Sequence, residues 1–116
     1  MHVLIIMHDA PYGSERPYQA LRLAGAILQV DDEVELTVYL TADAVLCARK
    51  GQQTPEGYYN IERMLKPILR RGIVMTCRMC MAARGMTEED LADGVLPTRL
   101  GDLAQLTFEA DRILVY

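Results

Sequence analysis

The sequence predicts an α/β fold with a mostly parallel sheet and helices on both of its faces. Three observations lead to this prediction. Short apolar runs alternate along the chain with segments of helical periodicity, which is the order found in βαβ units. The first run, residues 3–7, is apolar without alternation, as in a strand that is buried on both faces. The 116 residues are 51% apolar and 24% charged, which suffices for the core of a single domain, residues 1–116.

The first predicted strand is followed by a turn and then by a helix. Residues 8–13 contain turn-forming Asp, Pro and Gly, and they end the strand. Ser14 is expected to cap the helix, with Pro17 in its first turn, where a missing N–H group costs little. Apolar residues at helical spacing predict the face that packs on the sheet, namely Ala20, Leu23, Ala24, Ile27 and Leu28.

The middle of the chain is predicted to hold a strand, a short helix, a loop and a longer helix. The strand is expected at residues 34–40 and the short helix at 41–49, while residues 51–57 lack any period and predict a loop. The longer helix is expected over residues 58–71. We expect a kink or break at Pro67 inside it, because a proline ring clashes with the carbonyl group four residues earlier.

The last part of the chain is predicted to alternate short strands with short helices. Gly72 is expected to follow the preceding helix as its C′ residue. The remaining elements are a strand at 73–76, a helix at 77–84, a strand at 95–96, a helix around 100–107 and a strand at 113–116. The expected core of the sheet includes Leu4, Ile6, Val38, Leu40, Val74 and Val115.

Charge and motifs argue against several classes of function. The 12 Lys and Arg against 16 Asp and Glu leave a net charge of −4, whereas phosphate backbones attract positive charge, so no nucleic acid partner is expected. Neither a GxxxxGK[ST] nor a GxGxxG pattern occurs, so no nucleotide cofactor is expected. The two histidines and three cysteines lack the spacing of a zinc site, so no metal is expected.

The opening of the chain and its cysteine content bear on its location. Residues 3–7 are too short an apolar run to span a membrane, and no basic segment precedes them. An odd number of cysteines in a small domain does not favour a disulfide framework. We therefore expect a cytoplasmic protein with no membrane partner and with free thiols.

Candidate functional residues lie where the predicted strands end, because open parallel sheets bind ligands beyond the carboxyl ends of their strands. His8, Thr41 and Cys77 follow the first three of the predicted strands. Cys77 lies where a strand meets a helix, and the unpaired N–H groups of a helix start, together with Arg78, stabilise a thiolate. Such a thiol serves as a nucleophile or a sulfur carrier. The equal alternative is a small buried apolar residue.

The roles of Cys80 and His8 stay open at this level. Cys80 lies three residues after Cys77, and three roles are open for it. It resolves a Cys77 intermediate as a disulfide, it contributes half of a metal site, or it packs on the short helix. No second CxxC motif is present to complete a metal site. His8 either supports the thiol or is only a turn residue. Cys47 lies in an apolar run and is expected in the core.

Four segments of the sequence resemble the DsrE/DsrF-like family. They are residues 72–77, Cys80 with residues 83–85, residues 102–104 and residues 110–116. The similarity is greatest to small uncharacterised bacterial members with a C-x-x-C-x-x-A-R-G segment, whereas sulfur-relay members of the TusD type have no counterpart of Cys80. The order of the predicted elements agrees with that family over nearly the whole chain.

The resemblance has implications for fold, assembly and site. It implies a three-layer α/β/α fold with a mostly parallel sheet of about five strands, assembled as a homotrimer or homohexamer. In sulfur-relay members one cysteine carries sulfur as a persulfide. Its position, counted back from the glycine of the Arg-Gly pair, falls on Cys77.

The leading hypothesis is a sulfur-relay protein. Cys77 accepts sulfane sulfur from a donor protein as a persulfide and passes it to the thiol of an acceptor protein, with Arg78, Cys80 and His8 as supporting residues. The lack of an ATP-site motif fits a sulfurtransferase-like carrier better than a complete enzyme. Two alternatives stand beside it. One is a thiol–disulfide redox protein that uses Cys77 and Cys80, and the other is a non-catalytic oligomeric binding protein whose thiols are incidental.

Overall fold

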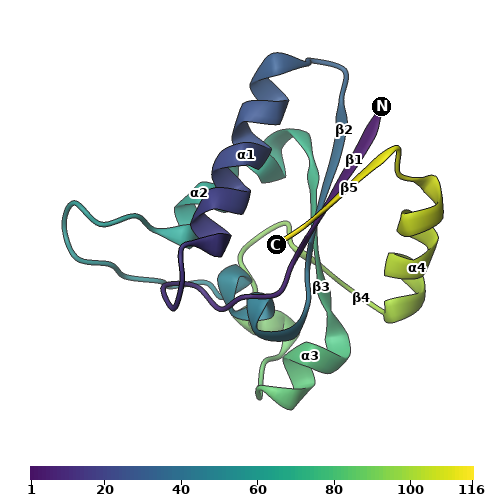
Figure 1. Ribbon diagram of the computed structural model, residues 1–116. Helices are drawn as coiled ribbons and strands as arrows, with labels where there is room; N and C mark the ends of the chain where they lie inside the picture. The colour runs from purple at the N-terminus through teal and green to yellow at the C-terminus, as the bar shows by residue number, and fades with distance from the viewer.

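The computed structural model describes all residues, 1–116, and contains one five-stranded sheet between layers of helices (Figure 1). The strands are β1 (His2–Met7), β2 (Glu35–Leu40), β3 (Ile73–Cys77), β4 (Leu96–Thr98) and β5 (Arg112–Val115). Their order across the sheet is β4-β3-β2-β1-β5, and every neighbouring pair is parallel. The predicted α/β fold with a parallel sheet of five strands is confirmed.

Helices cover both faces of the sheet. The helices α1 (Arg16–Val30) and α2 (Ile61–Arg71) lie on one face, and α4 (Leu100–Glu109) lies on the other (Figure 1). The short helix α3 (Arg78–Ala83) and the 3-10 helix η1 (Ala42–Ala48) directly follow the carboxyl ends of β3 and β2, and a second 3-10 helix, η2 (Glu88–Asp90), precedes β4. This is the expected three-layer arrangement. None of these helices combines the length and the apolar character that crossing a membrane requires.

The start of α1 and its packed face differ in detail from the prediction. Glu15, not Ser14, occupies the N-cap position, although Pro17 lies in the first turn as expected. Leu23 is 37% exposed, so its predicted place in the packed face is wrong, and Leu21 is buried instead. The buried stripe begins at Pro17, and its i, i+3, i+4 spacing selects position 21 rather than position 23.

The helix α2 begins later than predicted and continues through its proline. Asn60 caps it, because its side-chain oxygen accepts the N–H of Arg63 at 3.0 Å. The helix is continuous across Pro67, so the expected break is wrong. Burial of three apolar side chains on this helix offsets the backbone hydrogen bond that proline removes: Ile61, Leu65 and Ile68.

Gly72 ends α2 for a reason that the sequence did not reveal. Its φ is −125°, which is extended backbone rather than the left-handed conformation of a C′ glycine. A Cβ atom at this position would lie 2.8 Å from the carbonyl oxygen of Leu36. Glycine is therefore required for the close approach of the α2–β3 connection to β2.

The core lies mostly on the side of α1 and α2. A cluster of 23 buried residues fills that side, whereas the α4 side holds a smaller buried cluster of Leu4, Tyr39 and Cys77. Ile6 is only half-buried, and Val115 is 65% exposed, so its predicted place in the core is wrong. The reason is that β5 is an edge strand and Val115 is its last residue. Four predicted core residues are fully buried: Leu4, Val38, Leu40 and Val74.

Candidate functional site

Three strands end side by side at the carboxyl edge of the sheet. Met7 of β1 pairs with Leu40 of β2, which pairs with Thr76 of β3. The next residue of each segment therefore lies at the same edge, as the sequence predicted. The helices η1 and α3 start directly after β2 and β3. As a result, residues from the start of η1 face residues of α3.

Cys77 is the last residue of β3 and the N-cap residue of α3. Its backbone keeps extended geometry, with φ −83° and ψ 118°, and its side chain packs with Leu4 and Tyr39 on the α4 side of the sheet. Only 7% of Cys77 is exposed. No backbone N–H of α3 bonds its sulfur. The donors that we expected around Cys77 from the helix start are therefore not in contact with it.

Cys80 lies one turn further along α3, and its sulfur does have such donors. They come from the segment that follows β2 and not from α3 itself. The backbone N–H of Ala42 donates to Cys80 Sγ at 3.2 Å, and the Thr41 hydroxyl lies 3.5 Å from the same atom. Cys80 is also more exposed than Cys77. The two thiols therefore differ: Cys77 is buried, whereas Cys80 is partly exposed and its sulfur accepts a hydrogen bond.

The surroundings of Cys80 lower the pKa of its thiol below the ordinary value. Partial burial is the largest influence and acts to raise the pKa. The hydrogen-bonding groups of Thr41 and Ala42, the neighbouring Cys77 thiol and the positive charge of Arg84 together outweigh it. Each of these groups interacts more strongly with a thiolate than with a neutral thiol. Cys80 is therefore the thiol that the site favours as an anion.

Arg84 connects the two segments that form this site. Its Nη1 donates to the carbonyl oxygen of Cys80 at 3.0 Å. Its Nε and Nη2 both donate to Oδ1 of Asp43, at 3.0 Å and 2.8 Å. Asp43 belongs to η1 and Arg84 follows α3, so this ion pair holds the donors of Cys80 beside its sulfur.

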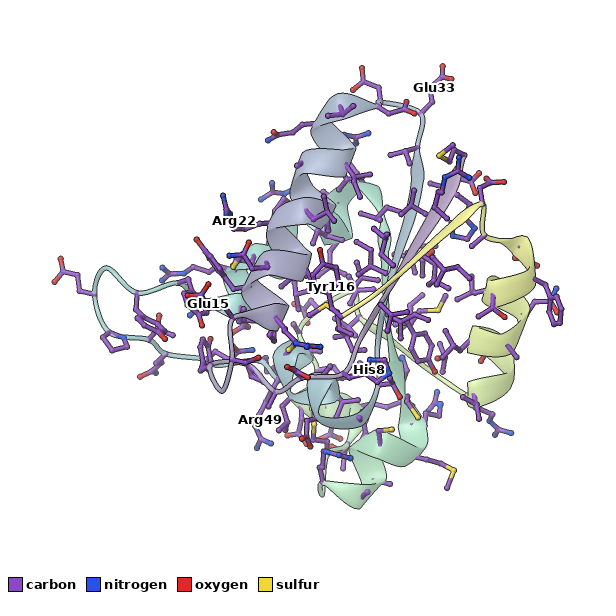
Figure 2. All side chains as sticks on the ribbon, in the orientation of Figure 1. His8, Glu15, Arg22, Glu33, Arg49 and Tyr116 are labelled. Carbon is purple, nitrogen blue, oxygen red and sulfur yellow. The ribbon has the colours of Figure 1, made fainter.

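Two residues that we expected to support the thiol have other partners. Arg78 forms an ion pair with Glu88 at the surface. His8 and Tyr116, both labelled in Figure 2, contact each other at the ends of β1 and β5. The backbone N–H of His8 donates to the carbonyl oxygen of Tyr116 at 3.0 Å, and Nδ1 of His8 lies 3.1 Å from the same oxygen. No hydrogen bond joins Arg78 or His8 to either thiol.

The third thiol is separate from the site. Cys47 is fully buried in the core, as predicted, and its S–H donates to the carbonyl oxygen of Asp9 at 3.6 Å. Burial, reinforced by the charge of Asp9, raises the pKa of Cys47 to about 12. Cys47 is therefore protonated at neutral pH. No group of three or more His, Cys, Asp or Glu side chains lies together in a way that could hold a metal ion.

Sequence reasoning located the edge but missed most of the groups that contact Cys80. The end of its strand predicts Thr41 at this edge, but nothing in the sequence indicates its role. Arg84 was noted within the A-R-G segment, and its position four residues after Cys80 is a usable signal, since such residues are neighbours on a helix. Ala42 acts through its backbone N–H, which has no signature in a sequence.

Comparison with known proteins places the chain in a family. A sequence model of the DsrE/DsrF-like family matches residues 1–116. Protein YchN of Escherichia coli (strain K12) is 37% identical over 115 residues, which cover 98% of this chain and 97% of YchN. Uncharacterized protein MJ0989 of Methanocaldococcus jannaschii is 34% identical over 117 residues, which cover 100% of both chains.

Solved structures give the same result for the fold. The crystal structure of YchN from Escherichia coli matches with a TM-score of 0.95 at 37% identity, covering 100% of this chain and 99% of that one. The protein of unknown function MTH1491 from Methanobacterium thermoautotrophicum matches with a TM-score of 0.79 at 15% identity, covering 99% and 97%. The second likeness concerns the fold alone.

Proposed function

The chain belongs to the DsrE/DsrF-like family, and from this membership we propose that it is a sulfur-relay protein that carries sulfane sulfur on Cys77. Cys80 acts in this proposal as the acceptor of the Cys77 proton. The sulfur arrives from a donor protein as a persulfide and leaves to a thiol of an acceptor protein. Residues 1–116 form the single domain that does this.

One observation carries the proposal. Cys80 packs against the buried cluster that contains Cys77, and the neighbouring Cys77 thiol is among the groups that lower the pKa of Cys80. Sulfur transfer requires a thiolate, since the thiolate and not the thiol is the nucleophile. Cys77 is buried, and Cys80, whose surroundings favour the thiolate form, lies beside it as the proposed proton acceptor.

The loading step balances without any further reagent. The proton of Cys77 passes to the Cys80 thiolate, and Cys77 Sγ attacks the outer sulfur of a donor persulfide R–S–SH. The new S–S bond forms on Cys77 while the donor S–S bond breaks, and the donor leaves as the thiolate R–S⁻. The chain then holds Cys77–S–SH. No electrons are gained or lost overall.

Unloading is the same exchange with the roles reversed. A thiolate of the acceptor protein attacks the outer sulfur of Cys77–S–SH, and Cys77 leaves as a thiolate. The proton that Cys80 received then returns to Cys77, which restores the starting pair. Arg84, with Asp43, keeps the Cys80 segment in place throughout, taking the part that we had expected of Arg78.

Peptide mapping after loading tests the proposal. The protein is incubated with glutathione persulfide, trapped with iodoacetamide and digested with trypsin. Cleavage after Arg78 places Cys77 and Cys80 on different peptides. The expected result is a gain of one sulfur, about 32 Da, on the Cys77 peptide. Cys77→Ser should lose this gain. Cys80→Ser should keep it but require a higher pH.

The possible outcomes test the assignment of sulfur to Cys77 separately from the sulfur-relay function. Sulfur found only on the Cys80 peptide would reverse the roles of the two thiols and contradict the assignment to Cys77. Sulfur on neither peptide, in a protein whose thiols still react with iodoacetamide, would contradict the sulfur-relay function. Cys47→Ala serves as the control variant and should load like the wild type, because Cys47 is buried and protonated.

A second candidate function rests on the same neighbouring pair of thiols. Two thiols three residues apart at a helix start form a disulfide in thiol–disulfide redox proteins. If Cys77 and Cys80 act in this way, a disulfide oxidant such as oxidised glutathione removes about 2 Da from the segment that contains both. The loading experiment distinguishes the two functions, because a carrier gains a stable sulfur whereas a dithiol protein reduces the persulfide and becomes a disulfide.

The remaining parts of the proposal concern assembly and setting. We place the relay in the cytoplasm, where thiols stay reduced. We propose a homotrimer or homohexamer, and the exposed apolar side chains of α4 and β5 support self-association. The most exposed of them are Leu100, Phe108 and Val115.

A further inference from the structure

The backbone of Ala42 has an unusual conformation beside the thiols. Its φ is 52°, in the left-handed region that residues other than glycine rarely adopt. Among the non-glycine residues of the chain, only Tyr12 shares a positive φ. Thr41 immediately before it is fully extended, with φ −124° and ψ 168°. The chain therefore reverses direction sharply between these two residues.

This reversal determines where the N–H of Ala42 points. The N–H of Thr41 bonds the carbonyl oxygen of Met7 and so continues the sheet, while the N–H of Ala44 bonds the carbonyl oxygen of Thr41 and so closes the first turn of η1. Between them, the N–H of Ala42 belongs to neither pattern and donates to Cys80 Sγ at 3.2 Å.

The conformation is held from both sides. On one side, Ala44 and Val45 of η1 are fully buried and anchor the helix in the core. On the other, the neighbouring Asp43 is fixed by its two hydrogen bonds from Arg84. Strained backbone persists only where its surroundings enforce it, and such residues gather at functional sites.

We infer that the left-handed backbone of Ala42 aims its N–H at Cys80 Sγ and makes Ala42 a positioning residue for that sulfur. The inference rests on the proposed role of Cys80 as proton acceptor. A residue that tolerates the left-handed conformation preserves the donor, whereas a residue that excludes it turns the N–H away. The residue at position 42 therefore controls the fraction of Cys80 that is ionised at neutral pH.

The test compares substitutions that differ in their tolerance of positive φ. Glycine adopts it freely, and a β-branched residue resists it strongly. We expect Ala42→Gly to keep the pH profile of Cys80 alkylation by iodoacetamide. We expect Ala42→Val to raise the pH midpoint of Cys80 alkylation and to slow alkylation of Cys80 at neutral pH by about tenfold. Ala26→Val, on the exposed face of α1, is the control for the added bulk.

The profile reports Cys80 separately from the other groups that surround it. These groups are Cys77, Arg84, Asp43 and Tyr39. Trypsin separates the Cys77 peptide from the Cys80 peptide, so each thiol is followed on its own. Burial raises the pKa of Tyr39 further above 10.0, so this phenol does not titrate in the range of interest.

A second measurement needs no substitution and therefore no assumption about folding of the variants. In the ¹⁵N-labelled wild-type protein, the amide resonance of Ala42 should shift with pH and follow the same midpoint as Cys80 alkylation. An Ala42 resonance that does not move through that midpoint would overturn the inference. A folded Ala42→Val variant with an unchanged alkylation profile would overturn it as well.

These readouts distinguish the inference from the proposed function. Alkylation and the amide shift measure ionisation of Cys80 and require no sulfur donor. If they behave as expected while no persulfide forms, the positioning role of Ala42 stands and the sulfur-relay function fails. If persulfide forms on Cys77 while the Ala42 variants leave Cys80 unchanged, the function stands and this inference fails.

Discussion

Arg84 donates two hydrogen bonds to a single oxygen of Asp43, from Nε at 3.0 Å and from Nη2 at 2.8 Å. The two residues are separated by 41 positions in the sequence and lie on the two segments that meet at the thiols. A third donor of Arg84, Nη1, bonds the backbone of Cys80. One guanidinium thus fixes the position of Cys80 relative to the segment that supplies its hydrogen bonds.

Replacing this guanidinium is expected to weaken the thiolate. Arg84→Met removes a positive charge that lowers the pKa of Cys80, so alkylation of Cys80 at neutral pH should slow by about threefold. Arg78→Met is the matched control, because Arg78 pairs with Glu88 instead. Fragment-ion mass spectrometry, which resolves the two cysteines in both variants, checks the rates. Equal slowing in the two variants would contradict the assignment of Arg84.

The Thr41 hydroxyl makes the largest contribution that lowers the pKa of Cys80. Thr41→Val keeps the shape of the side chain and removes the hydroxyl, so it should slow Cys80 alkylation at neutral pH by about tenfold. The effect should exceed that of Arg84→Met. Thr107→Val, on the exposed surface of α4, should have no effect on the rate. A smaller effect for Thr41→Val than for Arg84→Met would contradict the order of the contributions.

Gly72 should tolerate no side chain. Gly72→Ala places a Cβ atom 2.8 Å from the Leu36 carbonyl oxygen, and we expect it to lower the free energy of unfolding by about 1–3 kcal/mol. Gly25→Ala, in the middle of α1 with no atom within 4 Å, should instead raise it by up to about 1 kcal/mol. Urea denaturation followed by circular dichroism measures both. Stabilisation by both substitutions would show that the contact at Gly72 relaxes.

Cys47 should make the protein sensitive to alkaline pH. Burial holds its pKa at about 12 in the native state, against 9.0 for an unperturbed thiol. As the pH rises above about 9, the unfolded chain loses this proton while the native state keeps it, so the free energy of unfolding falls by about 1.4 kcal/mol per pH unit. Urea denaturation at several alkaline pH values measures this effect. Cys47→Ala should lack the part of the pH dependence of the free energy of unfolding that comes from this thiol. Identical slopes in the two proteins would count against the effect.

Self-association is the last expected outcome. Light scattering should give three or six times the 13.0 kDa mass of one chain. Phe108 is 89% exposed on α4, so Phe108→Ser removes apolar surface without disturbing the core and should shift the protein toward smaller species. Glu33→Ser, on the loop between α1 and β2, is the control. A single-chain mass for the wild type at micromolar concentration would contradict the expected assembly.

The fold was accessible from the sequence because its main determinants are local and periodic. Continuous apolarity over residues 3–7 and the stripe at Ile61, Leu65 and Ile68 both correspond to observed elements. The errors have long-range causes. Whether Val115 is buried depends on which strand lies at the edge of the sheet, and whether Pro67 breaks a helix depends on how well that helix packs.

The site was accessible only in part, for a related reason. Strand ends place Cys77 and Thr41 at one edge, and both the strand-to-helix position and the family resemblance single out Cys77. The donors of Cys80 come from a backbone N–H and from a hydroxyl about 40 positions earlier in the chain. Any residue has an N–H group, so no composition or spacing marks Ala42. Only the packing of η1 beside α3 reveals which of the two sulfurs these groups contact.

The pairing of β1 with β5 also constrains how the protein is made. Val3 of β1 lies opposite Arg112 of β5, so this side of β1 stays unpaired until β5 has been synthesised. While the chain is still on the ribosome, one edge of β1 is unpaired, and an apolar unpaired edge is where nascent chains aggregate. Translation that stalls before residue 112 therefore leaves an aggregation-prone fragment, whereas synthesis of β5 pairs this edge of β1.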